Sequence, residues 1–126
     1  MIKLKNLLLE KYYIHNTKNP ESIRKQGLKL YDGVFGKAIY LVLPEHDIHS
    51  YGAKTVSLKV ELKKNVKLNK EYNNKNAYEN LMKLKNEVSN LRKYFLDKGF
   101  DGLDLTKFMH EPQLVLYNVK MIKKIT

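Results

Sequence analysis

The chain has 126 residues, 43% of them hydrophobic, which suits one compact domain with an ordinary core and leaves little room for a second. It contains no cysteine, which excludes disulfides, thiolate zinc sites and a cysteine nucleophile. We therefore expect a single domain over residues 1–126, in a reducing, cytoplasmic setting.

The formal net charge of +11 suggests a polyanionic partner such as a nucleic acid or an acidic protein. The alternative is a compositional bias of an A+T-rich genome, because lysine and asparagine are abundant while Arg24 and Arg92 are the only arginines. Arginine is the residue best suited to bidentate recognition of phosphates and bases. No stretch approaches the ~18 apolar residues of a membrane span, so we expect no membrane association and no targeting segment.

The first half of the chain reads as short elements separated by turns. Residues 11–17 predict a strand, and 19–27 predict a helix that begins near Pro20 and stops at Gly27. An apolar strand is expected over 36–43, followed by a short helix from Pro44 to about residue 50. The clean alternation of TVSLKVEL (55–62) indicates a half-buried strand.

The second half predicts one long helix over 77–98, because its apolar residues recur near a 3.6-residue period and Gly99 follows as a stop. Short strands are expected around it, over 66–69, 100–105, 112–118 and 121–125. The chain is therefore predicted to be an α+β domain with mostly short strands and one long helix.

No polar cluster matches a common catalytic plan. The sequence has no HExxH, no GxSxG elbow, no P-loop and no GxGxxG fingerprint. His46 and His49 are spaced i, i+3 and lack an obvious third ligand, so no metal site is expected. What remains is a dispersed set of polar and aromatic residues: His15, Tyr40, Tyr51, Glu111 and Gln113.

In their order and local contexts these residues resemble the NAD-dependent ADP-ribosyltransferases, in the branch that includes poly(ADP-ribose) polymerases and diphtheria-like toxins. YIHNT resembles the family's strand with His followed by two small polar residues, and SIRKQGLKL its helix and Gly-Leu. GKAIY resembles the GKGIY-type strand, and Tyr51 follows Tyr40 by the eleven positions typical of the family. EPQLVLYN resembles the late strand written EYIVYN, and VKMIKKI the last one.

The resemblance implies a split sheet of short, mainly antiparallel strands around an NAD cleft. NAD is then a substrate, and Tyr40 and Tyr51 hold its nicotinamide ring by stacking. His15 binds the ribose on the adenosine side, the backbone of Asn16 clamps the carboxamide, and Thr17 adds a hydroxyl contact. A carboxylate binds the other ribose and stabilises the oxocarbenium-like cation formed when the nicotinamide leaves.

The catalytic position departs from the family pattern. Counting back from Tyr117, the position of the family glutamate holds Gln113, while Glu111 lies two residues earlier. Residues i and i+2 of a strand face the same side, so Glu111 reaches the site if the strand extends that far. Pro112 is tolerated at a strand start. Both Glu111 and Gln113 are kept as catalytic candidates. Family members lacking the glutamate transfer a single ADP-ribose or are inactive.

The expected function is a mono-ADP-ribosyltransferase that acts on a protein or nucleic-acid target, as a bacterial or phage effector or as a toxin bound by an antitoxin. A catalytically inactive ADP-ribosyltransferase fold that only binds is the alternative. An RNA 2′-phosphotransferase fits less well, because it needs more arginines and usually a further RNA-binding domain. A plain lysine-rich nucleic-acid binder would leave the arrangement of His15, Tyr40 and Tyr51 to coincidence.

Overall fold

The computed structural model describes residues 12–44 and 56–126, and it is an α+β arrangement in these ranges. The strands are β1 (Tyr13–Thr17), β2 (Ile39–Leu41), β3 (Val56–Leu62), β4 (Leu68–Asn69), β5 (Gly102–Leu105), β6 (Gln113–Leu116) and β7 (Ile122–Ile125). The helices are α2 (Pro20–Gln26), α3 (Ala77–Val88) and α4 (Leu91–Asp97), with a short 3₁₀ turn at Val119–Met121. The predicted class of mainly antiparallel short strands is confirmed.

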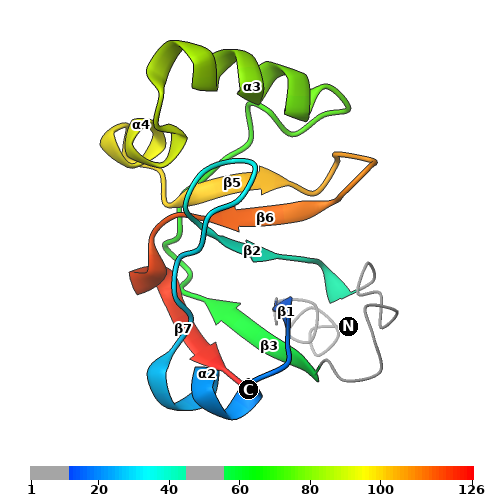
Figure 1. Ribbon diagram of the computed structural model, residues 1–126, viewed down its shortest axis with the longest axis vertical. Helices are drawn as coiled ribbons and strands as arrows, with labels where there is room; N and C mark the ends of the chain where they lie inside the picture. The colour runs from blue at the N-terminus through cyan, green and yellow to red at the C-terminus, as the bar shows by residue number, and fades with distance from the viewer. Residues whose placement is uncertain (1–11, 45–55) are drawn as a thin grey trace, which may run out of the picture.

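The strands form two sheets, ordered β1-β3-β7 and β2-β6-β5-β4, and every pairing in them is antiparallel except β4 with β5. The sheets meet where Ile14 and Val42 exchange two backbone hydrogen bonds, of 2.8 and 3.0 Å. Figure 1 shows α3 and α4 beside the four-stranded sheet, and α2 near β7 at the opposite end of the molecule.

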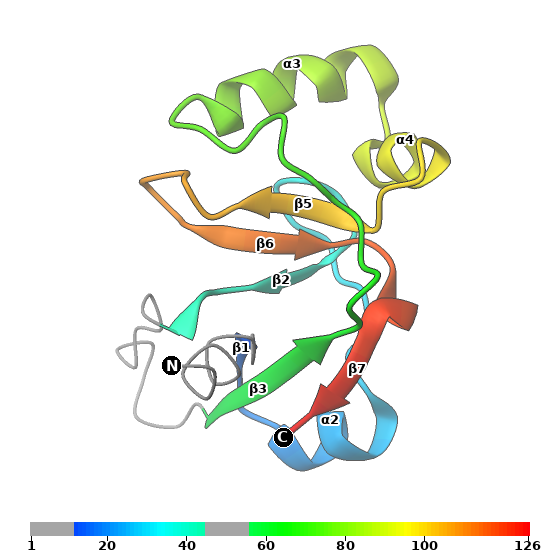
Figure 2. The same cartoon turned by 180° about the vertical axis from the view of Figure 1, so that it is seen from behind.

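The four-stranded sheet is buried on both faces. One face packs on α3 and α4 through a cluster that includes Leu81, Phe95 and Val115. The other faces the three-stranded sheet through a second cluster, which includes Leu41, Val60 and Leu116. This explains why all four residues of β6 are buried, and the view from behind shows the sheet between α3 and α4 on one side and the other three strands on the other (Figure 2).

Several elements form where their sequence predicts them. β3 follows its alternation, with Leu58 and Val60 fully buried and Lys59 exposed. α2 carries Pro20 in its first turn and ends at Gly27, whose φ of 79° suits a residue without a Cβ. The strand predicted over 36–43 is shorter, since only Ile39–Leu41 forms regular ladder pairs. The helix predicted after Pro44 lies outside the described residues.

The prediction of one long helix over 77–98 is wrong, because α3 and α4 are separate helices. Ser89 has φ 66° and ψ −41°, and the N–H of Asn90 donates to the carbonyl of Val88 at 2.7 Å. These values describe a classic γ-turn, which cannot belong to a helix. The side chain of Asn90 then accepts a hydrogen bond from the N–H of Lys93 and caps α4. No helix in the described ranges is long and apolar enough to cross a membrane.

Candidate functional site

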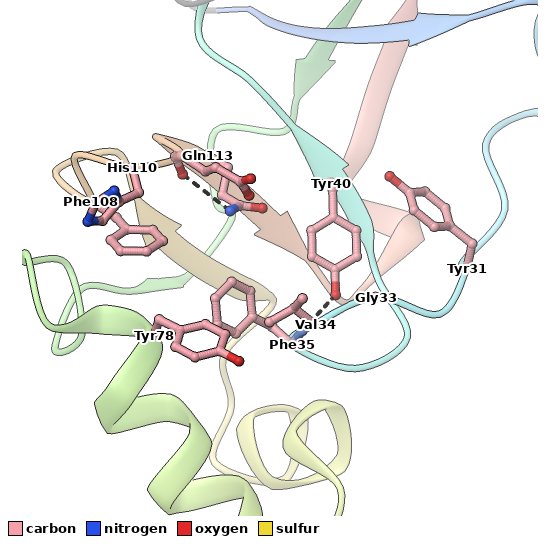
Figure 3. Close-up of a pocket in the computed structure, with 10 residues that line it drawn as sticks. Tyr31, Gly33, Val34, Phe35, Tyr40, Tyr78, Phe108, His110 and Gln113 are labelled. Carbon is pink, nitrogen blue, oxygen red and sulfur yellow. Dashed lines mark hydrogen bonds between the residues drawn. The ribbon is translucent and has the colours of Figure 1, made fainter.

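An open pocket of about 670 Å³ lies where the four-stranded sheet, the loop before β2 and the start of α3 come together (Figure 3). Aromatic rings dominate its lining. The residues around it are Tyr31, Gly33, Val34, Phe35, Tyr40, Tyr78, Phe108, His110, Glu111 and Gln113. Three of the residues predicted to form the site, Tyr40, Glu111 and Gln113, are therefore in one pocket.

Strand pairing explains why Tyr40 and Gln113 share this pocket. In the register of β2 with β6, Tyr40 lies opposite Val115. Directly opposite residues project from the same face of a sheet, and so do residues two apart in one strand. Tyr40, Val115 and Gln113 therefore face the same side.

The phenol of Tyr40 is tied to the loop that precedes its strand. Its hydroxyl accepts a hydrogen bond from the N–H of Phe35 at 3.0 Å and donates one to the carbonyl of Gly36 at 2.7 Å. A Cβ on Gly33 would clash with the ring of Tyr40, so glycine suits this close approach of the loop. Burial raises the pKa of Tyr40 to about 12, so the phenol stays neutral and keeps its proton for Gly36.

A second phenol, that of Tyr117, also bonds to this loop. The hydroxyl of Tyr117, fully buried at the end of β6, donates to the carbonyl of Phe35 at 2.7 Å. Tyr31 and Ala38 exchange two backbone hydrogen bonds of 3.1 Å across the loop. Because hydrogen bonds hold the loop at several points, it is a preformed wall of the pocket.

Gln113 occupies the strand position and Glu111 does not. Gln113 is the first residue of β6 and only 8% exposed, and its Nε2 donates to the carbonyl of Glu111 at 3.2 Å. Glu111 is exposed and precedes the strand, yet it lines the pocket. The condition that the strand extend to Glu111 is not met, but the turn through Pro112 brings both residues to the same pocket. Of the described residues lining it, Glu111 alone carries a carboxylate.

His15 lies in a second, smaller pocket. This pocket, of about 220 Å³, lies between β1 and the region of α2, and it is lined by His15, Ser22, Ile23, Gln26, Gly27, Leu28, Lys29 and Tyr31. Burial lowers the pKa of His15, although a hydrogen bond with the backbone of Tyr40 opposes the shift. The imidazole is therefore neutral at neutral pH.

Tyr31 joins the two pockets because it lines both of them. Its ring centroid lies 5.4 Å from that of Tyr40 and 6.5 Å from that of His15. The three rings form a continuous aromatic row from β1 to β2. Tyr31 was not predicted from the sequence, although its position in the Gly-containing turn before the GKAIY strand was a usable signal.

Asn16 and Thr17 line neither pocket. The Oδ1 of Asn16 accepts a hydrogen bond of 2.6 Å from the hydroxyl of Ser57. The backbone N–H and C=O of Ile14 bond to Val42, on the edge of β1 that faces away from β3. Because these groups alternate between the two edges along a strand, the backbone groups of Asn16 point to the same edge as those of Ile14. The Thr17 hydroxyl accepts from the N–H of Asn19 at 3.0 Å, at the entry to α2.

Some residues named from the sequence are not among the residues that the structure describes. Tyr51, the second predicted stacking ring, lies outside the described residues, and so do His46 and His49. Within the ranges 12–44 and 56–126, no group of three or more His, Asp or Glu side chains is arranged to hold a metal ion.

The rest of the pocket comes from residues that the sequence analysis did not assign to the site. Tyr78, in the first turn of α3, is 48% exposed and contacts the ring of Phe35 edge-on, with 6.5 Å between centroids. Phe108 and His110, in the loop between β5 and β6, pack edge-on with centroids 5.7 Å apart. Figure 3 shows these rings on the side of the pocket away from Tyr31. In the sequence, each of these three residues is an aromatic side chain next to a turn, and that pattern was the signal available for predicting them.

Comparisons with known proteins found no family model, no curated protein and no solved structure that matches this chain. No related protein therefore assigns a role to any residue of the pocket.

Proposed function

We propose that this protein is a mono-ADP-ribosyltransferase that cleaves NAD and transfers ADP-ribose to a macromolecule. The observation that carries the proposal is the shared pocket of Tyr40, Glu111 and Gln113, which adjoins the pocket of His15 across Tyr31. These residues come from separate parts of the chain, and the predicted chemistry requires them to meet. The resemblance of GKAIY and EPQLVLYN to the corresponding strands of the transferase family is the second support.

The proposed reaction needs a flat ring held in place while its bond to ribose breaks. Tyr40 supplies a stacking surface for nicotinamide, and its two hydrogen bonds to the loop hold its ring in a fixed orientation. A ring positioned in advance lowers the entropic cost of reaching the transition state. We assign the nicotinamide to the part of the pocket between Tyr40 and Gln113.

The negative charge that the cation requires comes from Glu111 in this proposal. As nicotinamide leaves with the bonding electron pair, positive charge develops on the ribose C1′ and O4′. A carboxylate fixed nearby stabilises that charge more than it stabilises the substrate, so it lowers the barrier. Gln113 acts through its amide, which holds the backbone of Glu111.

The smaller pocket accounts for the other half of the dinucleotide. His15 is neutral there and can exchange hydrogen bonds with ribose hydroxyls without the cost of burying a charge. A dinucleotide that crosses Tyr31 would occupy both pockets. Because NAD is abundant in the cytoplasm, we place the activity there, as a bacterial or phage effector or as a toxin held by an antitoxin.

The test is incubation of the full chain with NAD, with and without a cell lysate, followed by measurement of free nicotinamide and labelled macromolecules. The proposal expects both products, and it expects Tyr40→Ala to remove them. No nicotinamide release and no label transfer over a range of pH and salt would overturn it.

A catalytically inactive NAD-binding module is the second candidate. The observation that favours it is Gln113 at the first position of β6, where the family pattern has its carboxylate. In that case the wild type binds NAD in calorimetry without turnover, and Glu111→Gln changes nothing. Gln113→Glu would then create activity, whereas the transferase proposal expects it to break the hydrogen bond to Glu111 and lower turnover.

A further inference from the structure

The end of the larger pocket formed by Tyr78, Phe108 and His110 is not used by the reaction proposed for Tyr40 and Glu111. We name these three residues the outer ring set. At about 670 Å³ the pocket lies within the range of roughly 300–1,000 Å³ typical of sites for whole small molecules. One six-membered ring between Tyr40 and Gln113 leaves the outer ring set open to a second group.

We propose that the outer ring set binds an unpaired nucleobase, which makes single-stranded nucleic acid the acceptor of ADP-ribose. This inference rests on the proposed transferase function. Tyr78 is half-exposed despite its place beside buried Ala77 in the first turn of α3. An exposed ring facing a pocket offers a stacking surface, and stacking is how proteins hold unpaired bases.

The chemistry of the lining argues against other acceptors. A carboxyl acceptor would need a cation, and none of the ten described residues lining the pocket is lysine or arginine. A guanidinium acceptor on a basic protein segment would be repelled by the net charge of +11. An uncharged, flat base avoids both costs.

The charge of the chain suits the rest of such an acceptor. In the sequence beside the outer ring set, Lys75 and Lys107 are balanced by Glu79 and Glu111, so the net charge of +11 comes from residues elsewhere in the chain. That excess attracts phosphates on either side of a bound base and raises the rate of encounter. A single strand can place its base in the pocket without the cost of opening a duplex.

The transfer balances as follows. The C1′–N bond of NAD breaks, and its electron pair goes to the nicotinamide nitrogen, which becomes neutral. A ring or exocyclic nitrogen of the base forms the new bond to C1′. That nitrogen loses one proton, which the carboxylate of Glu111 accepts before releasing it to water.

The experiment uses the full chain, labelled NAD and four acceptors: single-stranded DNA, the same sequence as RNA, the DNA as duplex, and a nucleic-acid-free protein lysate. The proposal expects label on a single-stranded oligonucleotide and not on the duplex, and the DNA and RNA arms identify the strand type. Tyr78→Ala should raise the KM for the oligonucleotide about tenfold without changing nicotinamide release in the absence of acceptor. Tyr78→Phe keeps the ring and should behave as the wild type.

Label found only on protein, or an oligonucleotide KM unchanged by Tyr78→Ala, would overturn the nucleobase site. Nicotinamide release without label on any oligonucleotide would overturn it too while leaving the transferase proposal intact. No nicotinamide release at all would remove both. Circular dichroism of both Tyr78 variants checks that they fold.

Discussion

Gln113 donates a hydrogen bond of 3.2 Å from its side chain to the backbone carbonyl of Glu111, so the two residues are linked at one edge of the aromatic pocket. The amide is 8% exposed and the carboxylate is exposed. Their difference in burial matches the different roles that we propose for them, because a buried amide can hold a turn while an accessible carboxylate can meet a substrate.

Glu111→Gln should lower the rate of nicotinamide release about a hundredfold, the scale of losing one transition-state charge contact. The affinity for NAD should hardly change, because the carboxylate acts on charge that develops during the reaction. Steady-state kinetics with calorimetry separates the two effects. Glu87→Gln, at an exposed position of α3 away from the pocket, is the matched control. An equal loss in both variants would contradict the role of Glu111.

Tyr40→Phe should lower the free energy of unfolding by about 1–2 kcal/mol, because it leaves the N–H of Phe35 and the carbonyl of Gly36 without their part-buried partner. Urea denaturation measures this change. Tyr78→Phe removes a hydroxyl from a half-exposed ring and should shift the free energy by less than about 0.5 kcal/mol. Equal effects at both positions would show that the loop does not depend on the phenol of Tyr40.

The free energy of unfolding should fall at acidic pH because of His15. Burial lowers its pKa below the ordinary value of 6.5, so the unfolded chain binds its proton first. The stabilising contribution of the neutral imidazole is complete above pH 6.5 and decreases as the pH falls toward the lower, folded-state pKa. Denaturant titrations from about pH 7.5 to about pH 5 should show a steeper loss in the wild type than in His15→Gln. Parallel curves would contradict this account.

Ser89→Gly should stabilise the fold by about 0.5–1 kcal/mol, because the γ-turn holds a non-glycine residue at φ 66°. Asn86→Gly, at an exposed position inside α3, should have the opposite sign, since glycine weakens a helix interior by a similar amount. Thermal or urea unfolding measures both. Destabilisation by Ser89→Gly would mean that the junction of α3 and α4 is not strained.

Local patterns predicted the elements whose information is local. The alternation of β3 and the terminal signals of α2 are properties of consecutive side chains, so both elements appear where expected. The break at Ser89 was missed because the apolar period continues through it: Leu81 in α3 and Phe95 in α4 join the same core. Periodicity reports the buried face and not the backbone between two helices.

The site was predictable only in part for a related reason. Tyr40, Glu111 and Gln113 lie on or beside strands that pair, and motif order pointed to them. Tyr78 and Phe108 reach the pocket from a helix start and a loop, and their positions depend on how α3 packs on the sheet. That packing is long-range and leaves no mark in the neighbouring residues.

The most direct measurement of the central claim is nicotinamide release from NAD by the wild-type chain, compared with Tyr40→Ala and Glu111→Gln. Tyr40→Ala removes the stacking ring, and Glu111→Gln removes the carboxylate that we assign to this pocket. We predict release by the wild type, no release by Tyr40→Ala, and about a hundredfold slower release by Glu111→Gln. NAD that stays intact with the wild type, or release that neither substitution lowers, would contradict the assignment.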